Sequence, residues 1–109
     1  MSKDYQTLLL TGDLTIKSST QTKQRVEEAL AGAAVGTATL LVDIADEHDA
    51  DLTLAQLLLS AKKTAERVQV VFRLKRPVAG SLLAVLTRGG LIGAGTPDNE
   101  FWLHEGVTQ

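Results

Sequence analysis

One short segment of this chain constrains its fold more than any other. Thr39-Leu40-Leu41-Val42-Asp43-Ile44 is apolar on both faces of an extended strand as far as Asp43. Such a strand has to be covered on both faces, or lie in the middle of a sheet against helices. The segment therefore predicts a central strand in a sheet that carries helices.

Helical periods alternate with short apolar runs on either side of that strand. The periods place apolar residues on one face of three helices, the third with Pro77 in its first turn. The residues expected to be buried are Val26, Ala29, Leu30 and Ala33; then Leu54, Leu57, Leu58, Ala61 and Ala65; and then Val78, Leu82, Val85 and Leu86. The run 68–72 predicts another strand. This alternation of strands and helices indicates a mostly parallel sheet.

The two ends of the chain predict further strands. Residues 7–10 and 14–16 flank Thr11-Gly12-Asp13, a turn signal, and so predict a hairpin. A last short strand is expected at 101–103. With 109 residues, the chain suits one domain, 1–109, with one core. The expected fold class is an α/β sandwich, with a mixed, mostly parallel sheet of about four or five strands and three or four helices.

Composition excludes several classes of function. The formal net charge is −2 and aromatic residues make up 4% of the chain, which argues against a nucleic-acid surface. The absence of cysteine excludes disulfides and thiolate-bound zinc. Apolar runs are far shorter than the ~20 residues of a spanning helix, and residues 1–5 show no apolar leader. A cytoplasmic location without membrane insertion is the expectation.

An acidic stretch, 46–51, follows the central strand and is expected to form a loop. Its carboxylates, with Asp43, are the oxygen ligands that divalent cations prefer, but the spacing lacks the glycine and the distant glutamate of an EF-hand loop. His48 and His104 have no nucleophile motif beside them. We therefore expect no metal, no cofactor and no enzymatic activity. Arg73, Lys75 and Arg76 form a small basic patch that could meet an acidic partner or remain solvated.

Asp51 stands directly before the second expected helix. A carboxylate in that place accepts hydrogen bonds from free backbone N–H groups and suits the positive end of the helix dipole. This capping role needs no further function. A partner-docking role for Asp51 and Thr53 is compatible with it.

Over residues 7 to 103 the chain resembles the STAS family, the sulphate-transporter and anti-sigma-antagonist domains. That family typically has a strand ending in Asp, a short loop, and then Asp-Ser-(Ser/Thr/Ala)-Gly-Leu leading into a Leu-rich helix. Here the corresponding stretches are Leu41-Val42-Asp43-Ile44 and Asp51-Leu52-Thr53-Leu54-Ala55-Gln56-Leu57-Leu58. The run 10–14 also resembles the family's first hairpin, and 86–91 resembles its third helix. Leu52 stands where the phosphorylatable Ser would be, and Leu54 replaces the usual Gly.

The resemblance implies a protein–protein interaction module in bacterial regulation. Its partner would be an anti-sigma factor or a kinase-like signalling protein. The docking surface would comprise Asp49, Asp51, Leu52, Thr53 and Gln56. Because Leu52 has no hydroxyl, phosphorylation at the usual position is not expected, and Thr53 is the nearest substitute. The alternative is a STAS accessory subunit of a membrane lipid-transport ATPase, which would have the same size and fold.

Overall fold

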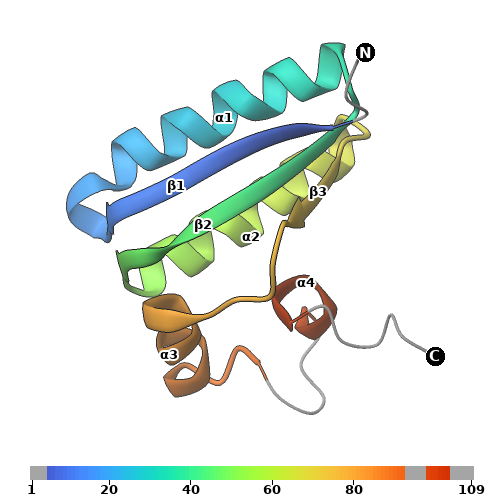
Figure 1. Cartoon of the computed structure of the whole chain (residues 1–109). Coiled ribbons are helices and arrows are strands. Elements are labelled where there is room, and N and C mark those ends of the chain that lie inside the picture. Colours follow the sequence, from blue (N-terminus) through green and yellow to red (C-terminus); the bar gives the residue numbers. More distant parts are fainter. Residues whose placement is uncertain (1–4, 93–97, 104–109) are drawn as a thin grey trace.

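The structure is a computed structural model that describes residues 5–92 and 98–103 (Figure 1). Its elements follow one another along the chain as strand β1 (Gln6–Leu14), the 3-10 turn η1 (Ile16–Ser18), helix α1 (Ser19–Val35), strand β2 (Thr39–Ala50), helix α2 (Leu52–Arg67), strand β3 (Val71–Leu74), helix α3 (Gly80–Arg88) and the short helix α4 (Asn99–Leu103). Strands and helices therefore alternate as the sequence predicts.

The three described strands form one parallel sheet in the order β1-β2-β3. Val42 of β2 lies opposite Leu8 of β1 and Leu74 of β3, so β2 is paired on both sides. Leu40 and Val42 are 0% and 1% exposed. The prediction of a central strand at this segment is confirmed.

Helices α1 and α2 pack on the same face of the sheet. Both crossover connections step in the same direction along the sheet, and the right-handed rule then places both helices on one side. They contact each other as well as the strands. The strand residues on that face are buried: Leu8, Leu10, Leu40, Val42, Phe72 and Leu74. On the opposite face Leu9 and Val71 are about half exposed.

Each helix buries most of the residues that its sequence period predicts, although Leu57 of α2 is only half-buried. The residues Val26, Ala29, Leu30 and Ala33 of α1 are buried, as are Leu54, Leu58, Ala61 and Ala65 of α2 and Leu82 and Leu86 of α3. α3 packs on β2 and α2, whereas α4 lies beside β3. There the ring of Phe101 stacks on Phe72 at a centroid distance of 5.9 Å. The described residues share one hydrophobic core.

The predicted hairpin at the start of the chain is wrong. Residues 6–14 form one continuous strand that runs parallel to β2. Gly12 does adopt the left-handed backbone that a turn signal indicates, with φ +81°. However, the irregularity is a bulge in the sheet and not a chain reversal. Between the pairs Leu10–Ile44 and Gly12–His48, β1 advances by two residues while β2 advances by four.

Other predicted boundaries also need correction. The acidic stretch 46–51 is not a loop, because β2 continues through it to Ala50 and pairs with the end of β1. β3 begins at Val71, since α2 runs to Arg67 and Gln69 turns the chain with φ +62°. α3 begins at Gly80, three residues after Pro77, and Val85 is only half-buried. The expected last strand at 101–103 belongs to α4, because Phe101 and Trp102 bury their rings from a helical turn.

The α/β class is confirmed, although the sheet of the described residues has three strands, all parallel, and not the four or five mixed strands expected. The α-helices of residues 5–92 and 98–103, four in number, agree with the three or four predicted. Among the described helices, none is both long and apolar enough to cross a bilayer.

Candidate functional site

The start of α2 is held in place by the two carboxylate oxygens of Asp51. Oδ1 accepts a hydrogen bond of 3.0 Å from the backbone N–H of Thr53, which is the capping interaction predicted from the sequence. Oδ2 accepts one of 2.9 Å from the N–H of Ile16, in the connection between β1 and α1. One side chain therefore fixes two connections relative to each other, and the capping prediction is confirmed.

The other residues of the predicted docking surface lie around this fixed point. Asp49 is exposed at the end of β2, where it lies opposite Asp13 in the sheet register. Leu52, in the first turn of α2, is 46% exposed. Thr53 is half-buried and Gln56 is exposed. The five predicted residues thus lie close together, at the end of β2 and in the cap and first turns of α2.

A groove begins at this surface and follows the contact between α1 and α2. Its first part has a volume of about 350 Å³. The floor is formed by the buried Val26, Leu30 and Ala61, whereas Thr53 and Gln56 belong to its wall. Two of the predicted docking residues are therefore also groove residues.

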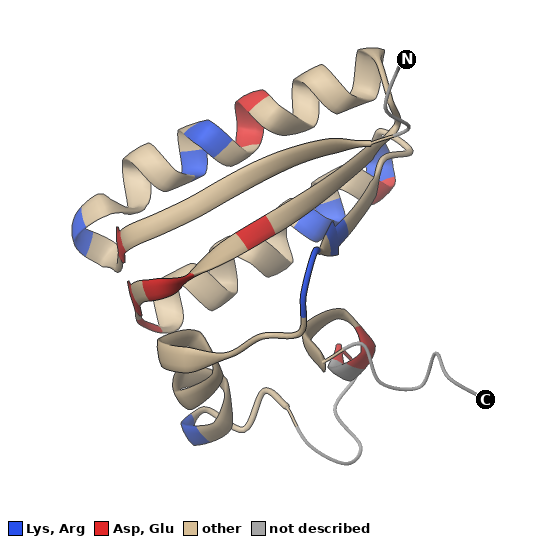
Figure 2. Ribbon diagram, viewed as in Figure 1, with Lys and Arg blue, Asp and Glu red and all other residues tan. Residues whose placement is uncertain are grey.

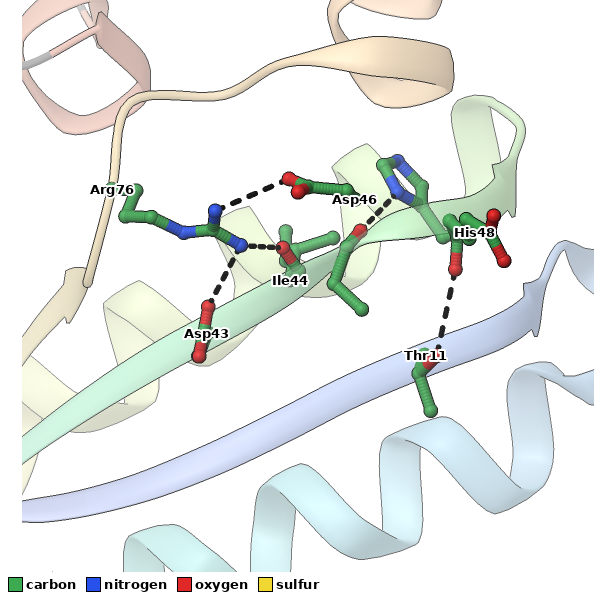
Figure 3. Close-up of polar contacts among 8 residues, drawn as sticks. Thr11, Asp43, Ile44, Asp46, His48 and Arg76 are labelled. Carbon is green, nitrogen blue, oxygen red and sulfur yellow. Dashed lines mark hydrogen bonds and ion pairs between the residues drawn. The ribbon is translucent and has the colours of Figure 1, made fainter.

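The bulge in β2 forms a second cluster, drawn in Figure 3. A bulge leaves backbone groups without ladder partners, and the side chains of Arg76, of Thr11 in β1 and of His48 in β2 itself supply hydrogen bonds to them. Nη2 of Arg76 donates to the carbonyl of Ile44 at 2.8 Å. The His48 ring bonds the carbonyl of Ala45 through Nδ1 at 2.7 Å. The Thr11 hydroxyl donates to the carbonyl of Glu47 at 3.5 Å.

His48 also joins the bulge to α3. Its Nε2 accepts a hydrogen bond of 3.2 Å from the N–H of Leu82, in the first turn of that helix. With Nε2 as the acceptor from Leu82, Nδ1 is the ring nitrogen that can donate to the carbonyl of Ala45. α3 has no capping side chain of its own at Ala79, so a residue more than thirty positions earlier performs that role. A further bond, from the N–H of Ala50 to the Ser81 hydroxyl, parallels it.

Arg76 binds two carboxylates besides its carbonyl partner. Nη1 lies 3.1 Å from Asp46 and Nη2 lies 3.1 Å from Asp43. The charges of Asp46 and Asp43 raise the pKa of Arg76 further above its already high value. In the predicted basic patch, Arg73 is likewise paired, with Glu100 at 3.1 Å. Two of the three cations are therefore engaged within the chain.

This second cluster borders a hollow of about 360 Å³ at the carboxyl ends of β2 and β3. Both nitrogens of His48 already have backbone partners, and Asp46 is paired with Arg76. Within residues 5–92 and 98–103, no three acidic or histidine side chains converge as metal ligands would. The cluster is explained by the hydrogen bonds that the bulge requires. His104 lies outside the described residues.

Sequence reasoning missed the bulge and the link from His48 to α3. Gly12 was the available signal, because a glycine inside an apolar run marks either a turn or a bulge. Nothing in the spacing of His48 and Leu82 shows that they meet, since their contact depends on where the third helix begins.

Neither a scan against models of protein families nor a search of curated proteins finds a match for the chain.

Proposed function

We propose that this chain is a protein–protein interaction module of bacterial regulation, similar in its role to the anti-sigma factor antagonists. It docks a kinase-like signalling partner or an anti-sigma factor through the surface at the start of α2. The observation that carries this proposal is the combination of an exposed Leu52 with the free polar groups of Asp49 and Gln56, on a backbone that Asp51 fixes. The likeness of 51–58 to the STAS motif supports the same surface.

The chemistry of this surface suits binding better than catalysis. Asp49 makes no hydrogen bond or ion pair with another described residue, so its carboxylate is available to a partner. Leu52 offers an apolar side chain that the fold leaves 46% exposed. Both oxygens of Asp51 are already used, so we assign to Asp51 the positioning of its neighbours and not a direct contact. Leu52 has no hydroxyl, so the docking is constitutive or is controlled elsewhere.

The test begins with capture of the native partner on the tagged whole chain and its identification by mass spectrometry. An anti-sigma factor or a kinase-like protein supports the proposal, whereas a transporter ATPase supports the accessory-subunit alternative. Binding kinetics of the identified partner are then measured for the double variant Asp49→Lys and Gln56→Ala. Charged surface residues act mainly on association rates. We expect slower association and a weaker salt dependence.

The matched control is Glu28→Lys, the same charge reversal at an exposed position of α1 outside this surface. It should leave the association rate close to that of the unchanged chain. If the double variant binds the partner with unchanged affinity, the surface at the start of α2 is not the docking surface.

A further inference from the structure

The two outer strands of the sheet differ in how their free edges are protected. β3 has four residues, with Arg73 in the strand and Lys75 and Arg76 directly after it. Short length and cations are features that keep an edge strand from pairing with another chain. β1 has nine residues, and from Gln6 to Gly12 it contains no charged residue and no proline (Figure 2). This longer edge therefore has neither kind of protection in its own sequence.

The sheet register shows which backbone groups of β1 are free. The carbonyl of Val42 accepts a hydrogen bond from the backbone directly after β3, so the backbones of Leu41 and Asp43 face β1. In a parallel ladder, such residues bond the neighbours of the residue that lies opposite them. Thr7 and Leu9 are the residues opposite. Their own backbone groups therefore face away from β2, toward the free edge.

One side chain of α1 lies across this edge. Nη2 of Arg25 donates a hydrogen bond of 2.8 Å to the carbonyl of Leu9, and both residues are exposed. Arg25 makes no ion pair with another described residue, and no other described side chain bonds the backbone of Thr7 or Leu9. The guanidinium therefore occupies an acceptor near the middle of the edge and places an uncompensated positive charge beside it.

The edge of β1 is complementary to itself in an antiparallel arrangement. When Leu9 faces Leu9 of a second copy, Thr7 faces Thr11 and Asp13 faces Tyr5. No like charges are opposed along the strands, and Thr–Thr pairs across neighbouring strands are favourable. The obstacle is Arg25, because it holds the carbonyl that the second strand needs. In addition, the two guanidinium groups of such a pair meet near the two-fold axis and repel each other.

We infer that Arg25 keeps this chain from pairing with a second copy of itself through β1. The contact is autoinhibitory, since it closes an uncharged edge that otherwise extends the three-stranded sheet into one continuous sheet of two copies. Cations are one of the means by which proteins prevent pairing between sheet edges, and here the cation comes from the helix that follows the strand. This inference is independent of the proposed function, which concerns the start of α2.

The experiment is sedimentation velocity of the purified whole chain over a series of concentrations, for the unchanged chain and for Arg25→Ala. Alanine is a strong helix former, so α1 should persist, and circular dichroism checks that it does. The matched control is Arg67→Ala, which removes an exposed guanidinium without a described partner from α2. A further variant combines Arg25→Ala with Leu9→Lys, which places two like charges opposite each other in the paired edge.

The unchanged chain and Arg67→Ala should sediment as monomers, whereas Arg25→Ala should self-associate as a dimer at least tenfold more tightly. Adding Leu9→Lys should restore the monomer. The inference is overturned if Arg25→Ala associates no more tightly than the unchanged chain, or if the combined variant still associates. It is also overturned if the unchanged chain is a dimer that Leu9→Lys alone dissociates, because the edge is then open in the presence of Arg25.

Discussion

Replacing His48 with alanine should loosen α3 without disturbing the rest of the sheet. The imidazole is the only described side chain that accepts from the first turn of α3, and it also satisfies the carbonyl of Ala45 in the bulge. Its Cε1 lies 3.4 Å from where a Cβ on Gly80 would be, so it also fills space against the start of the helix. Alanine removes all three contributions.

The size of the effect follows from those contacts. Loss of a helix cap costs about 0.5–2 kcal/mol, and loss of an ordinary hydrogen bond costs about 1 kcal/mol. Because the helix is short and the carbonyl is only partly buried, we expect about 2 kcal/mol for His48→Ala. For a chain of this size that corresponds to a decrease of about 10 °C in melting temperature.

The assay is urea and thermal unfolding at pH 7.5, combined with amide hydrogen exchange. Exchange should accelerate most in α3, where the capped N–H of Leu82 loses its acceptor. The matched control is Thr11→Val, which removes another bulge contact, exposed and 3.5 Å long, and should change the stability by less than about 0.5 kcal/mol. If His48→Ala costs no more than Thr11→Val, the bond from Leu82 does not stabilise α3 and the reasoning is refuted.

Three further outcomes follow from the polar contacts of the chain. Hydrogen bonds from the Thr15 hydroxyl and amide hold the pKa of Asp13 below its ordinary value of 3.8, so Asp13 contributes stability above the unfolded-state pKa, and this stability is lost as pH falls through the folded-state pKa. Asp13→Asn should therefore be less stable than the parent near pH 6, with a difference in stability that narrows below about pH 4. A difference that stays constant from pH 6 to 2 in thermal melts would contradict this. Arg76→Ala should lower the melting temperature most at low salt, because its ion pairs are exposed and are screened by salt. Arg67→Ala is the control, since its guanidinium pairs with no described residue, and it should show no such salt dependence. Equal salt dependence in both variants would count against a stabilising role of the Arg76 ion pairs. Intact-mass measurement after incubation with the cognate kinase should show no stoichiometric phosphate on Thr53. The expectation would be reversed by a phosphate on Thr53 that abolishes partner binding, if Thr53→Val prevents that loss of binding.

The sequence predicts the central strand and the buried faces of three helices because those features depend on local patterns. Residues 40–42 form an uninterrupted apolar run, and Val26 and Leu30 are one helical turn apart. These patterns hold whatever the rest of the chain does. The capping role of Asp51 is equally local, since its first partner is two residues away.

The errors occur where a local signal has two structural solutions. Gly12 indicates a backbone irregularity, but only the pairing with β2 determines that it is a bulge and not a turn. Polar residues at 46–51 suggest a loop, yet the strand continues because the end of β1 pairs with it. The second bond of Asp51, to Ile16, and the bond from Leu82 to His48 join distant segments. Residue types and spacing do not determine contacts of that kind.

The all-parallel sheet also determines the order in which this chain can assemble. Among the described strands, a helix always separates two neighbours along the chain. The first paired residues of β1 and β2, Gln6 and Leu40, are 34 residues apart in the sequence. Closing a loop of that length costs about 3 kcal/mol of chain entropy before any strand pairing compensates for it. Two neighbouring strands can therefore pair only when the helix between them is included, and the shorter of the two such segments is 39–74, with β2, α2 and β3. Until α1 docks, the apolar β2 remains uncovered, so the early folding phase is the one in which this chain is most exposed to aggregation.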